Sequence, residues 1–349
     1  LPDTSESLFK EILFRAHELG VEVRFSPVDA TSYAEWVNQQ GRSRFILTLL
    51  ARKIRALHLA KVSRLIADND LNIDNITRLS GRVDLDHEGP DSKACVEFSL
   101  RGEPGANFRR DLMAVGAAMD VDIALQADTI FRRNRRLISF DMDSTLIDTE
   151  VIDELAEHAK VGEQVKNVTS RAMSGELDFA SSLRKRVSLL KGLDESYLRM
   201  VAEGLPLMEG AEHLFSTLNM LGYKTALLSG GFTYFGEVLK ERLGIDYVFA
   251  NELEISEGKL TGRVKEPIVD AQRKAELLEK LAIRENISME QTIAVGDGAN
   301  DLAMLGVAGL GIAFHAKPMV KESAKYSISN LGLDSILYLM GIRDREKTI

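Results

Sequence analysis

The sequence predicts an α/β fold, an open parallel sheet with a helical insertion, preceded by a smaller α+β module. From residue 137 onward, short apolar runs alternate with helix-like segments, the order of a parallel sheet covered by helices on both faces. Before residue 131 the order is strand, helix, strand, strand, helix, strand, which is that of a split βαβ module. A long and mostly helical stretch at about 150–205 separates the first two strands of the second region.

Composition sets the class of protein before any motif is considered. The chain has 349 residues, which predicts two or three domains, and its 45% hydrophobic and 28% charged content is typical of a globular protein. A net charge of −9 argues against a nucleic-acid partner, and no apolar run has the length of a membrane span. The single cysteine, Cys95, predicts no internal disulfide and favours a reduced, cytoplasmic location.

The first region predicts one helix and then a compact module over residues 44–130. An amphipathic pattern predicts a helix in LFKEILFRAHEL, within residues 1–43. Apolar runs predict strands at 45–50, 72–80, 94–100 and 121–128, and helical spacing predicts helices at 56–71 and 105–120. Cys95 falls in one of these strands, so we expect a buried thiol. The charged run RRNRR at 132–136 marks the junction with the second region.

The second region, residues 135–345, predicts a Rossmann-like sheet. Compact apolar runs that end in polar residues predict strands at 137–141, 225–230, 292–297 and 310–314. Helices are expected at about 209–221, 233–243, 270–281 and 300–307. SEGK lies between two alternating runs, so residues 247–264 are expected to form a β-hairpin.

Reactive side chains end three of the predicted strands, namely Asp141, Ser229 and Asp297. Ligands of open α/β sheets collect at the carboxyl ends of the strands, so these groups are expected to meet. Asp141 and Asp143 in DMDST would repel each other unless a cation lies between them or one is protonated. Either condition suits phosphoryl transfer by a carboxylate nucleophile with an acid beside it. The alternative is a polar turn that only caps a helix.

Two further motifs suit a phosphate and a metal ion. Asp297, Asn300 and Asp301 in VGDGAND offer the oxygen ligands that Mg²⁺ prefers. The glycines of LLSGG (227–231) allow backbone N–H groups to approach an anion closely, although the same run suits a plain strand-to-helix turn. Lys274 could reach a phosphoryl oxygen, or it could be a solvated helix lysine.

DMDST, LLSGG and GDGAND occur in one order, and this combination resembles the haloacid dehalogenase superfamily over roughly residues 135–340. Within it the chain is most similar to the phosphoserine phosphatases, through DMDSTLIDTEVIDELA, SLRKRVSLLKGL, LLSGGF and IAVGDGAND. The resemblance implies Mg²⁺-dependent hydrolysis of phosphoserine to serine and phosphate through a phosphoaspartyl intermediate. That reaction is the final step of serine biosynthesis.

The resemblance also implies a role for each matching residue. Asp141 would be the nucleophile and Asp143 the general acid and base. The metal ligands would be the Asp141 side chain, the Asp143 backbone carbonyl and the Asp297 side chain. Asn300 and Asp301 would orient the groups around the metal, and Asn300 would also bind the substrate. Ser229, Gly230 and Lys274 would bind the phosphate. Glu150 and Arg186 would bind the amino and carboxylate groups of the substrate, and Met173 and Phe179 would close the pocket.

Glu150 and Arg186 decide between alternative functions. One anion and one guanidinium would complement the ammonium and carboxylate of phosphoserine, although RKR at 184–186 could also be a solvated helix face. A phosphatase for another small phosphomonoester, or a phosphomutase, would not need Glu150 and Arg186. An inactive amino-acid sensor is the alternative from another class, and the presence of every acidic residue argues against it.

The module at 44–130 resembles an ACT-type domain, and residues 1–43 could be a diverged, partial copy of one. This resemblance implies serine as an effector. The first strand-to-helix loop reads ARKIRALHL, however, and contains no glycine to allow close approach of an effector. Pairing of two protomers through these sheets, as a homodimer, is the other interpretation.

Overall fold

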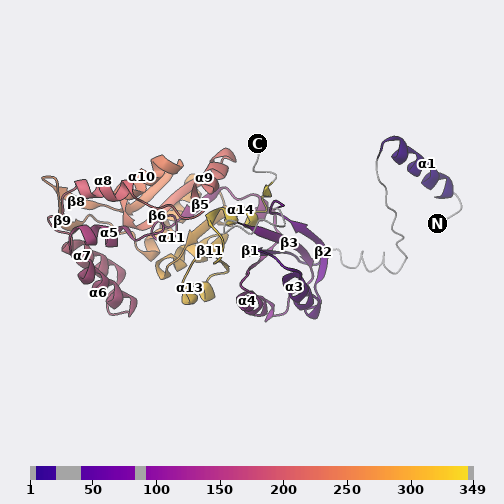
Figure 1. The fold of residues 1–349 in the computed structure, drawn as a ribbon, viewed down its shortest axis with the longest axis horizontal. Coiled ribbons are helices and arrows are strands. Elements are labelled where there is room, and N and C mark those ends of the chain that lie inside the picture. Colours follow the sequence, from indigo (N-terminus) through magenta and orange to yellow (C-terminus); the bar gives the residue numbers. More distant parts are fainter. Residues whose placement is uncertain (1–4, 21–40, 83–91, 345–349) are drawn as a thin grey trace. The chain divides into compact units, whose positions relative to one another are not determined.

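The computed structural model describes residues 5–20, 41–82 and 92–344 (Figure 1). The chain divides into two compact units, Leu1–Arg42 and Ser43–Ile349. In the first unit, α1 (Ser5–Glu18) confirms the amphipathic helix. The interpretation of residues 1–43 as a partial module falls mostly on residues 21–40, which lie outside the described part of the chain.

The second unit begins with a four-stranded antiparallel sheet in the order β2-β3-β1-β4. Two helices accompany it, and this arrangement confirms the predicted ferredoxin-like module. Its elements are β1 (Arg44–Ala51), α3 (Ala56–Asp68), β2 (Asn72–Arg78), β3 (Ala94–Arg101), α4 (Phe108–Met119) and β4 (Asp122–Ala127).

Both faces of β1, in the middle of this small sheet, are covered. Leu47 and Leu49 of β1 belong to a core that the module forms with its own helices. Leu50 and Cys95 point into a different core, which they share with Tyr338 and Leu339 near the end of the chain. Strands buried on both faces become continuous apolar runs, which explains the FILTLL sequence of β1.

A six-stranded parallel sheet follows in the order β12-β11-β10-β5-β6-β7. It confirms the four predicted strands of the second region. The strands are β5 (Leu137–Phe140), β6 (Lys224–Phe232), β7 (Tyr247–Asn251), β10 (Thr292–Gly296), β11 (Leu310–Phe314) and β12 (Tyr326–Ile328). The helices after the insertion are α9 (Ala211–Met220), α10 (Thr233–Leu243), α11 (Ala271–Arg284), α12 (Leu302–Val307), α13 (Pro318–Ser323) and α14 (Ile336–Leu339).

One edge strand of this sheet, β12, was not predicted, and the other, β7, was predicted as part of a hairpin. The hairpin exists, as β8 (Leu253–Ser256) and β9 (Lys259–Val264) around SEGK, but it is shorter than the predicted 247–264. Tyr247–Asn251 instead pairs parallel with β6 as an edge strand, and four of its five residues are half-buried. β12 has three residues, which is too short to give a pattern in the sequence.

The insertion between β5 and β6 is helical, as predicted, and we call it the cap. It contains α5 (Val151–His158), α6 (Gly162–Met173), α7 (Phe179–Leu189) and α8 (Ser196–Glu203), and α7 contacts β9 (Figure 1). The chain enters the cap after residues 146–148 and leaves it through residues 206–208. We call these two segments the hinge segments.

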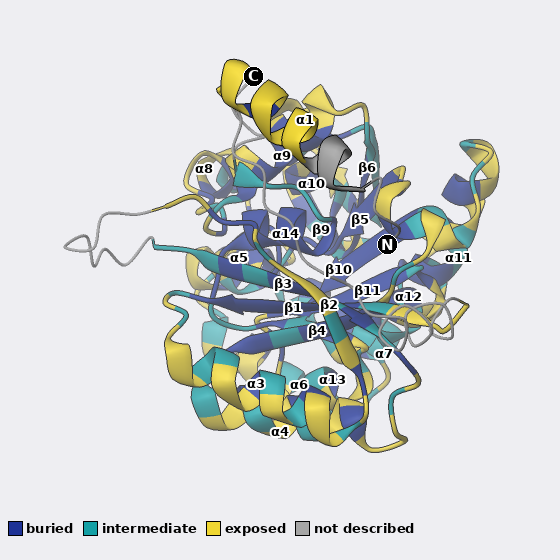
Figure 2. Ribbon diagram, turned by 90° about the vertical axis from the view of Figure 1, so that its right-hand side faces the viewer, coloured by how far each residue is buried: buried dark blue, intermediate teal, exposed yellow. Residues whose placement is uncertain are grey.

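The charged run at 132–136 is partly buried rather than solvated. Arg132 is 2% exposed and forms an ion pair with Glu97 of β3. Arg135 is also buried, and its guanidinium donates to the carbonyl oxygens of Glu290 and Thr292. Figure 2 shows the central strands of both sheets as buried, whereas β2 and the outer faces of α3 and α4 are largely exposed. No helix in the described residues is long and apolar enough to cross a membrane.

Candidate active site

The three motifs follow neighbouring strands. β10, β5 and β6 lie side by side in the sheet, so their carboxyl ends share one edge. Asp141 follows β5, Asp297 follows β10, and Ser229–Gly231 forms the end of β6. The structure therefore brings together the groups that the sequence places at three strand ends.

Lys274 connects two of the acidic side chains. Its Nζ lies 2.9 Å from Oδ1 of Asp141 and 2.7 Å from Oδ1 of Asp301, and the lysine side chain is 0% exposed. Burial by itself lowers the pKa of Lys274, but the charges of Asp141 and Asp301 outweigh burial and raise it above the ordinary value. The solvated-helix alternative for this lysine is wrong, because α11 directs it into the core of the site.

Asp141, Asp297 and Asp301 could hold a metal ion. One carboxylate oxygen from each lies within 4.8 Å of the others. Burial, followed by the charge of Asp141, raises the pKa of Asp297 to about 6 and that of Asp301 to about 7. A bound cation would relieve this repulsion, and carboxylate oxygens are the donors that hard divalent cations take. Asp141 and Asp297, with Asp301 beside them, therefore fit the divalent metal ion that the sequence predicts.

Neighbouring groups hold these carboxylates in place. Asp297 accepts a hydrogen bond from Thr145 Oγ1 at 3.1 Å, and Asp301 Oδ2 accepts one from the Gly298 N–H at 3.0 Å. Since Lys274 donates to the other oxygen of Asp301, both oxygens of that carboxylate have a partner. This arrangement suits the predicted role of Asp301 in orienting the metal site rather than coordinating directly.

Asp143 lies in surroundings that favour its protonated form. Burial raises its pKa well above the ordinary value, and the charges of Glu150 and Asp141 add to the effect. Its Oδ1 accepts a hydrogen bond from the Val151 N–H at 3.0 Å, which fixes the carboxyl group against the start of α5. A carboxyl group that keeps its proton near neutral pH can act as a general acid.

The glycines of the LLSGG motif lie in close contact with side chains of the site. A Cβ on Gly230 would lie 2.7 Å from Cζ of Phe179, and a Cβ on Gly231 would lie 2.6 Å from Oδ2 of Asp143. Ser229 is 0% exposed, its Oγ accepts a hydrogen bond from the Gly231 N–H at 2.9 Å, and it does not line the cavity. Its predicted contact with phosphate stays a prediction.

A cavity of about 540 Å³ lies between these strand ends and the cap. Arg186 of α7 lines it, and its Nε is buried without a hydrogen-bond partner in the described residues. Burial lowers the pKa of Arg186, and the charges of Glu150 and Asp153 oppose that shift. The cavity lining includes Asp141, Asp143, Asp297 and Asn300 from the sheet side, and Glu150, Met173, Phe179 and Arg186 from the cap side.

The cavity also contains residues that the sequence did not predict. Thr169 of α6 lines it from the cap, and Lys317 lines it from the loop after β11, where its Nζ lies 3.9 Å from Sδ of Met173. Lys317 follows a predicted strand, so the rule that placed Asp141 at a strand end could have found it. Thr169 gave no signal, because a threonine on a helix carries no motif. Met173 is 65% exposed, so it lies at the rim of the cavity.

Comparisons with known proteins agree with this geometry. The model of the haloacid dehalogenase-like hydrolases matches residues 135–309, half of the chain. A phosphoserine phosphatase of Streptomyces coelicolor is 43% identical over 307 residues, which cover 88% of this chain and 73% of that protein.

Two solved structures are also similar. The unliganded crystal structure of a probable phosphoserine phosphatase from Vibrio cholerae has a TM-score of 0.65 and 34% identity, and the match covers 87% of each chain. A substrate-bound phosphoserine phosphatase complex has a TM-score of 0.56 and 47% identity, and covers 60% of this chain and 99% of that one.

Proposed function

The chain belongs to the haloacid dehalogenase-like hydrolases, and from that premise we propose that it hydrolyses O-phospho-L-serine to L-serine and phosphate, the final step of serine biosynthesis. The observation that carries the proposal is the cap side of the cavity. Arg186 and Glu150 line the same cavity as Asp141 and Asp143, so one cation and one anion face the reactive carboxylates. Phosphoserine carries the matching carboxylate and ammonium beside its phosphate.

The reaction is proposed to proceed in two displacements at phosphorus. Within the described residues, the Asp141 carboxylate contacts the Met142 N–H and Lys274. Both contacts are made by Oδ1, so Oδ2 is available to attack phosphorus. The P–O bond to serine breaks as the Asp141–phosphorus bond forms, and Asp143 donates its proton to the serine oxygen. Water then attacks the phosphoaspartyl group and returns a proton to Asp143, and phosphate leaves.

Each remaining residue contributes positioning or charge. Lys274 holds the Asp141 side chain in place, and Gly230 and Gly231 allow the phosphate close to the backbone. Asp141, Asp297 and the Asp143 carbonyl would hold Mg²⁺, with Asp301 and Asn300 around it. When bound, the ion would offset the charge of the phosphoryl oxygens. Phe179 and Met173 would exclude water above the substrate.

Phosphate release from L-phosphoserine should depend on a divalent cation. We expect turnover with Mg²⁺ and a loss of at least about 10³-fold with excess chelator, because several carboxylates and the phosphate then repel one another. The assay compares L-phosphoserine with p-nitrophenyl phosphate, before and after Mg²⁺ is restored. Release from the aryl ester alone would retain the chemistry and reject the substrate, and full activity in chelator would reject the metal.

Arg186→Gln should raise KM for phosphoserine about 10- to 100-fold, since a hydrogen bond to a charged group contributes about 1.5–3 kcal/mol. Steady-state kinetics on both esters measure the effect, and hydrolysis of p-nitrophenyl phosphate should change little because that ester has no carboxylate. Arg184→Gln is the matched control: Arg184 lies on the same helix, is exposed and pairs with Glu266. Equal kinetics for the two variants would reject the carboxylate-binding role of Arg186.

Several further expectations remain proposals. The four-stranded module is proposed to be an ACT-like domain, either as a serine-binding domain or as the contact of a homodimer. In the structure the glycine-free segment 51–59 supplies Arg52 to an ion pair with Glu209. A cytoplasmic location follows from the single cysteine and is proposed on that ground alone.

A further inference from the structure

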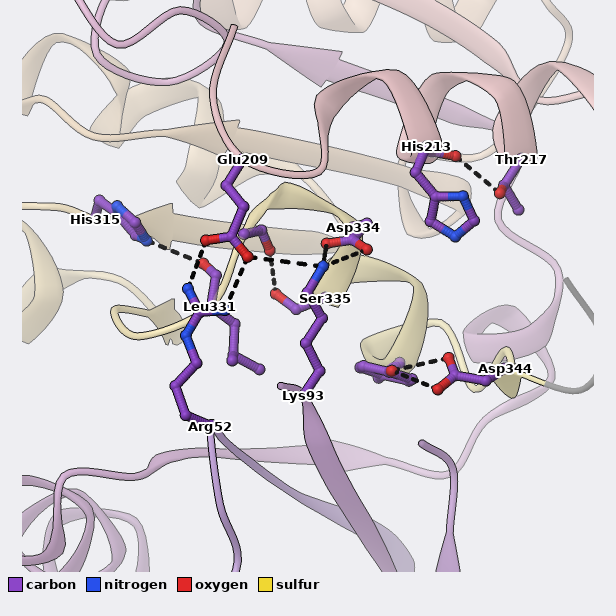
Figure 3. Close-up of polar contacts among 12 residues, drawn as sticks. Arg52, Lys93, Glu209, His213, Thr217, His315, Leu331, Asp334, Ser335 and Asp344 are labelled. Atoms are coloured by element: carbon purple, nitrogen blue, oxygen red, sulfur yellow. Dashed lines mark hydrogen bonds and ion pairs between the residues drawn. The ribbon is translucent and has the colours of Figure 1, made fainter. Parts of the chain in front are cut away.

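A cluster of four charged residues joins the four-stranded module, which we call the amino-terminal module, to the end of the hinge segment 206–208. Arg52 and Lys93 come from the module, and Glu209 and Asp334 come from the phosphatase domain (Figure 3). Arg52 donates to both oxygens of Glu209, at 2.8 and 2.5 Å. Lys93 Nζ lies 2.5 Å from Asp334 and 3.8 Å from Glu209. We call these four residues the clamp.

Glu209 directly follows one hinge segment of the cap. The Met208 N–H donates to the Leu146 carbonyl and the Asp148 N–H donates to the Pro206 carbonyl, both at 3.0 Å. Ile147 pairs with Leu207 in the same ladder. The two hinge segments therefore form a single paired unit, and the clamp holds the residue at its end.

The same ladder continues into the catalytic loop. Ile147 forms a second bridge, with Asp143, and the N–H groups of Leu146 and Ile147 both donate to the Met142 carbonyl, at 2.8 and 3.1 Å. The hinge segments and the catalytic loop therefore share one network of backbone hydrogen bonds.

The chain has little freedom at the clamp. Gly210 has φ +79°, and a Cβ there would lie 2.3 Å from Oδ1 of Asp334, so the backbone passes directly against that carboxylate. The Glu209 carbonyl also accepts a hydrogen bond of 2.7 Å from the Leu333 N–H. The module itself is anchored nearby, since Gln126 donates to the Leu339 carbonyl at 3.0 Å.

We propose that Arg52 and Glu209 are positioning residues for the reaction. Through their ion pair, the amino-terminal module holds the hinge segments of the cap in one position. The proposal rests on the proposed function, because the cap carries the two groups assigned to the amino and carboxylate ends of phosphoserine. A cap with a loose hinge presents these groups less often in their bound position. A loose hinge should slow the hydrolysis of an ester without amino and carboxylate groups much less.

The test is a double-mutant cycle of Arg52→Gln and Glu209→Gln. Each single variant should lower kcat/KM for phosphoserine about fivefold and leave kcat/KM for p-nitrophenyl phosphate within about twofold. The double variant should be no worse than either single one, because both remove the same interaction. Glu276→Gln is the control: Glu276 pairs with Arg273 at 3.0 Å within one helix and has a similar exposure, 42% against 38% for Glu209.

A structural measurement separates this proposal from the proposed function. Amide hydrogen exchange should be about fivefold faster at Met208 and Asp148 in the clamp variants and unchanged in Glu276→Gln. Unchanged exchange together with an unchanged preference for phosphoserine would overturn the clamp and leave the function intact. Equal losses on both esters would also overturn it, in favour of general destabilisation. If the wild type does not hydrolyse phosphoserine, the proposed function fails, and the exchange rates alone decide whether the hinge is held by the module.

Discussion

Asp141→Asn should abolish phosphate release from L-phosphoserine, with a loss of at least about 10⁴-fold in kcat. The amide has nearly the shape of the carboxylate but cannot attack phosphorus, so no phosphoaspartyl group can form. Folding should be preserved, because the substitution removes one of several buried negative charges and leaves Lys274 paired with Asp301. Phosphate release at saturating substrate measures the loss, and mass spectrometry of acid-quenched wild type detects the phosphoryl group on the peptide that contains Asp141.

Asp148→Asn is the control for this variant. Asp148 is exposed in the same loop, and only its backbone N–H takes part in the hinge ladder. Its activity should stay within about twofold of the wild type, as is usual for an exposed substitution. Substantial turnover by Asp141→Asn, or a phosphoryl adduct on another peptide, would show that the nucleophile lies elsewhere.

Lys274→Met should be the most destabilising of the substitutions considered. It leaves Asp141 and Asp301 buried without their shared cation, and removing one partner of a buried ion pair costs about 3–5 kcal/mol. We therefore expect a clear fall in the urea midpoint in the presence of chelator, together with loss of turnover. Mg²⁺ should restore part of the stability, since a second cation can then balance the two carboxylates.

Lys280→Met provides the comparison on the same helix. Lys280 is 62% exposed and lies 3.9 Å from Glu276, so its loss should change the unfolding free energy by less than about 0.5 kcal/mol. Similar urea midpoints for the two lysine variants would contradict the assignment of Lys274 as the cation of the site. A stability loss that Mg²⁺ does not reduce would contradict the shared carboxylate cluster.

The amino-acid pattern predicted the four-stranded module, four strands of the parallel sheet, the cap and the strand ends that carry the site. Compact apolar runs were sufficient because the strands at 137–141, 225–230, 292–297 and 310–314 are buried on both faces, so most of their residues are apolar. The strand-end rule then brought Asp141 and Asp297 together without coordinates. β12 was not predicted, because it has only three residues. Residues 247–251 were predicted as part of a hairpin, and the structure pairs them with β6 instead.

The packing of the chain, and no local pattern, shows which charged residues are buried. Lys274, Arg132 and Arg135 resemble ordinary surface cations in the sequence, yet all three are buried and have hydrogen-bonded or ionic partners. Their partners lie far away along the chain, and a local pattern carries no information about a distant carboxylate. The clamp has the same origin: Arg52 and Glu209 are 157 positions apart, and only packing of the module against the phosphatase domain makes them neighbours.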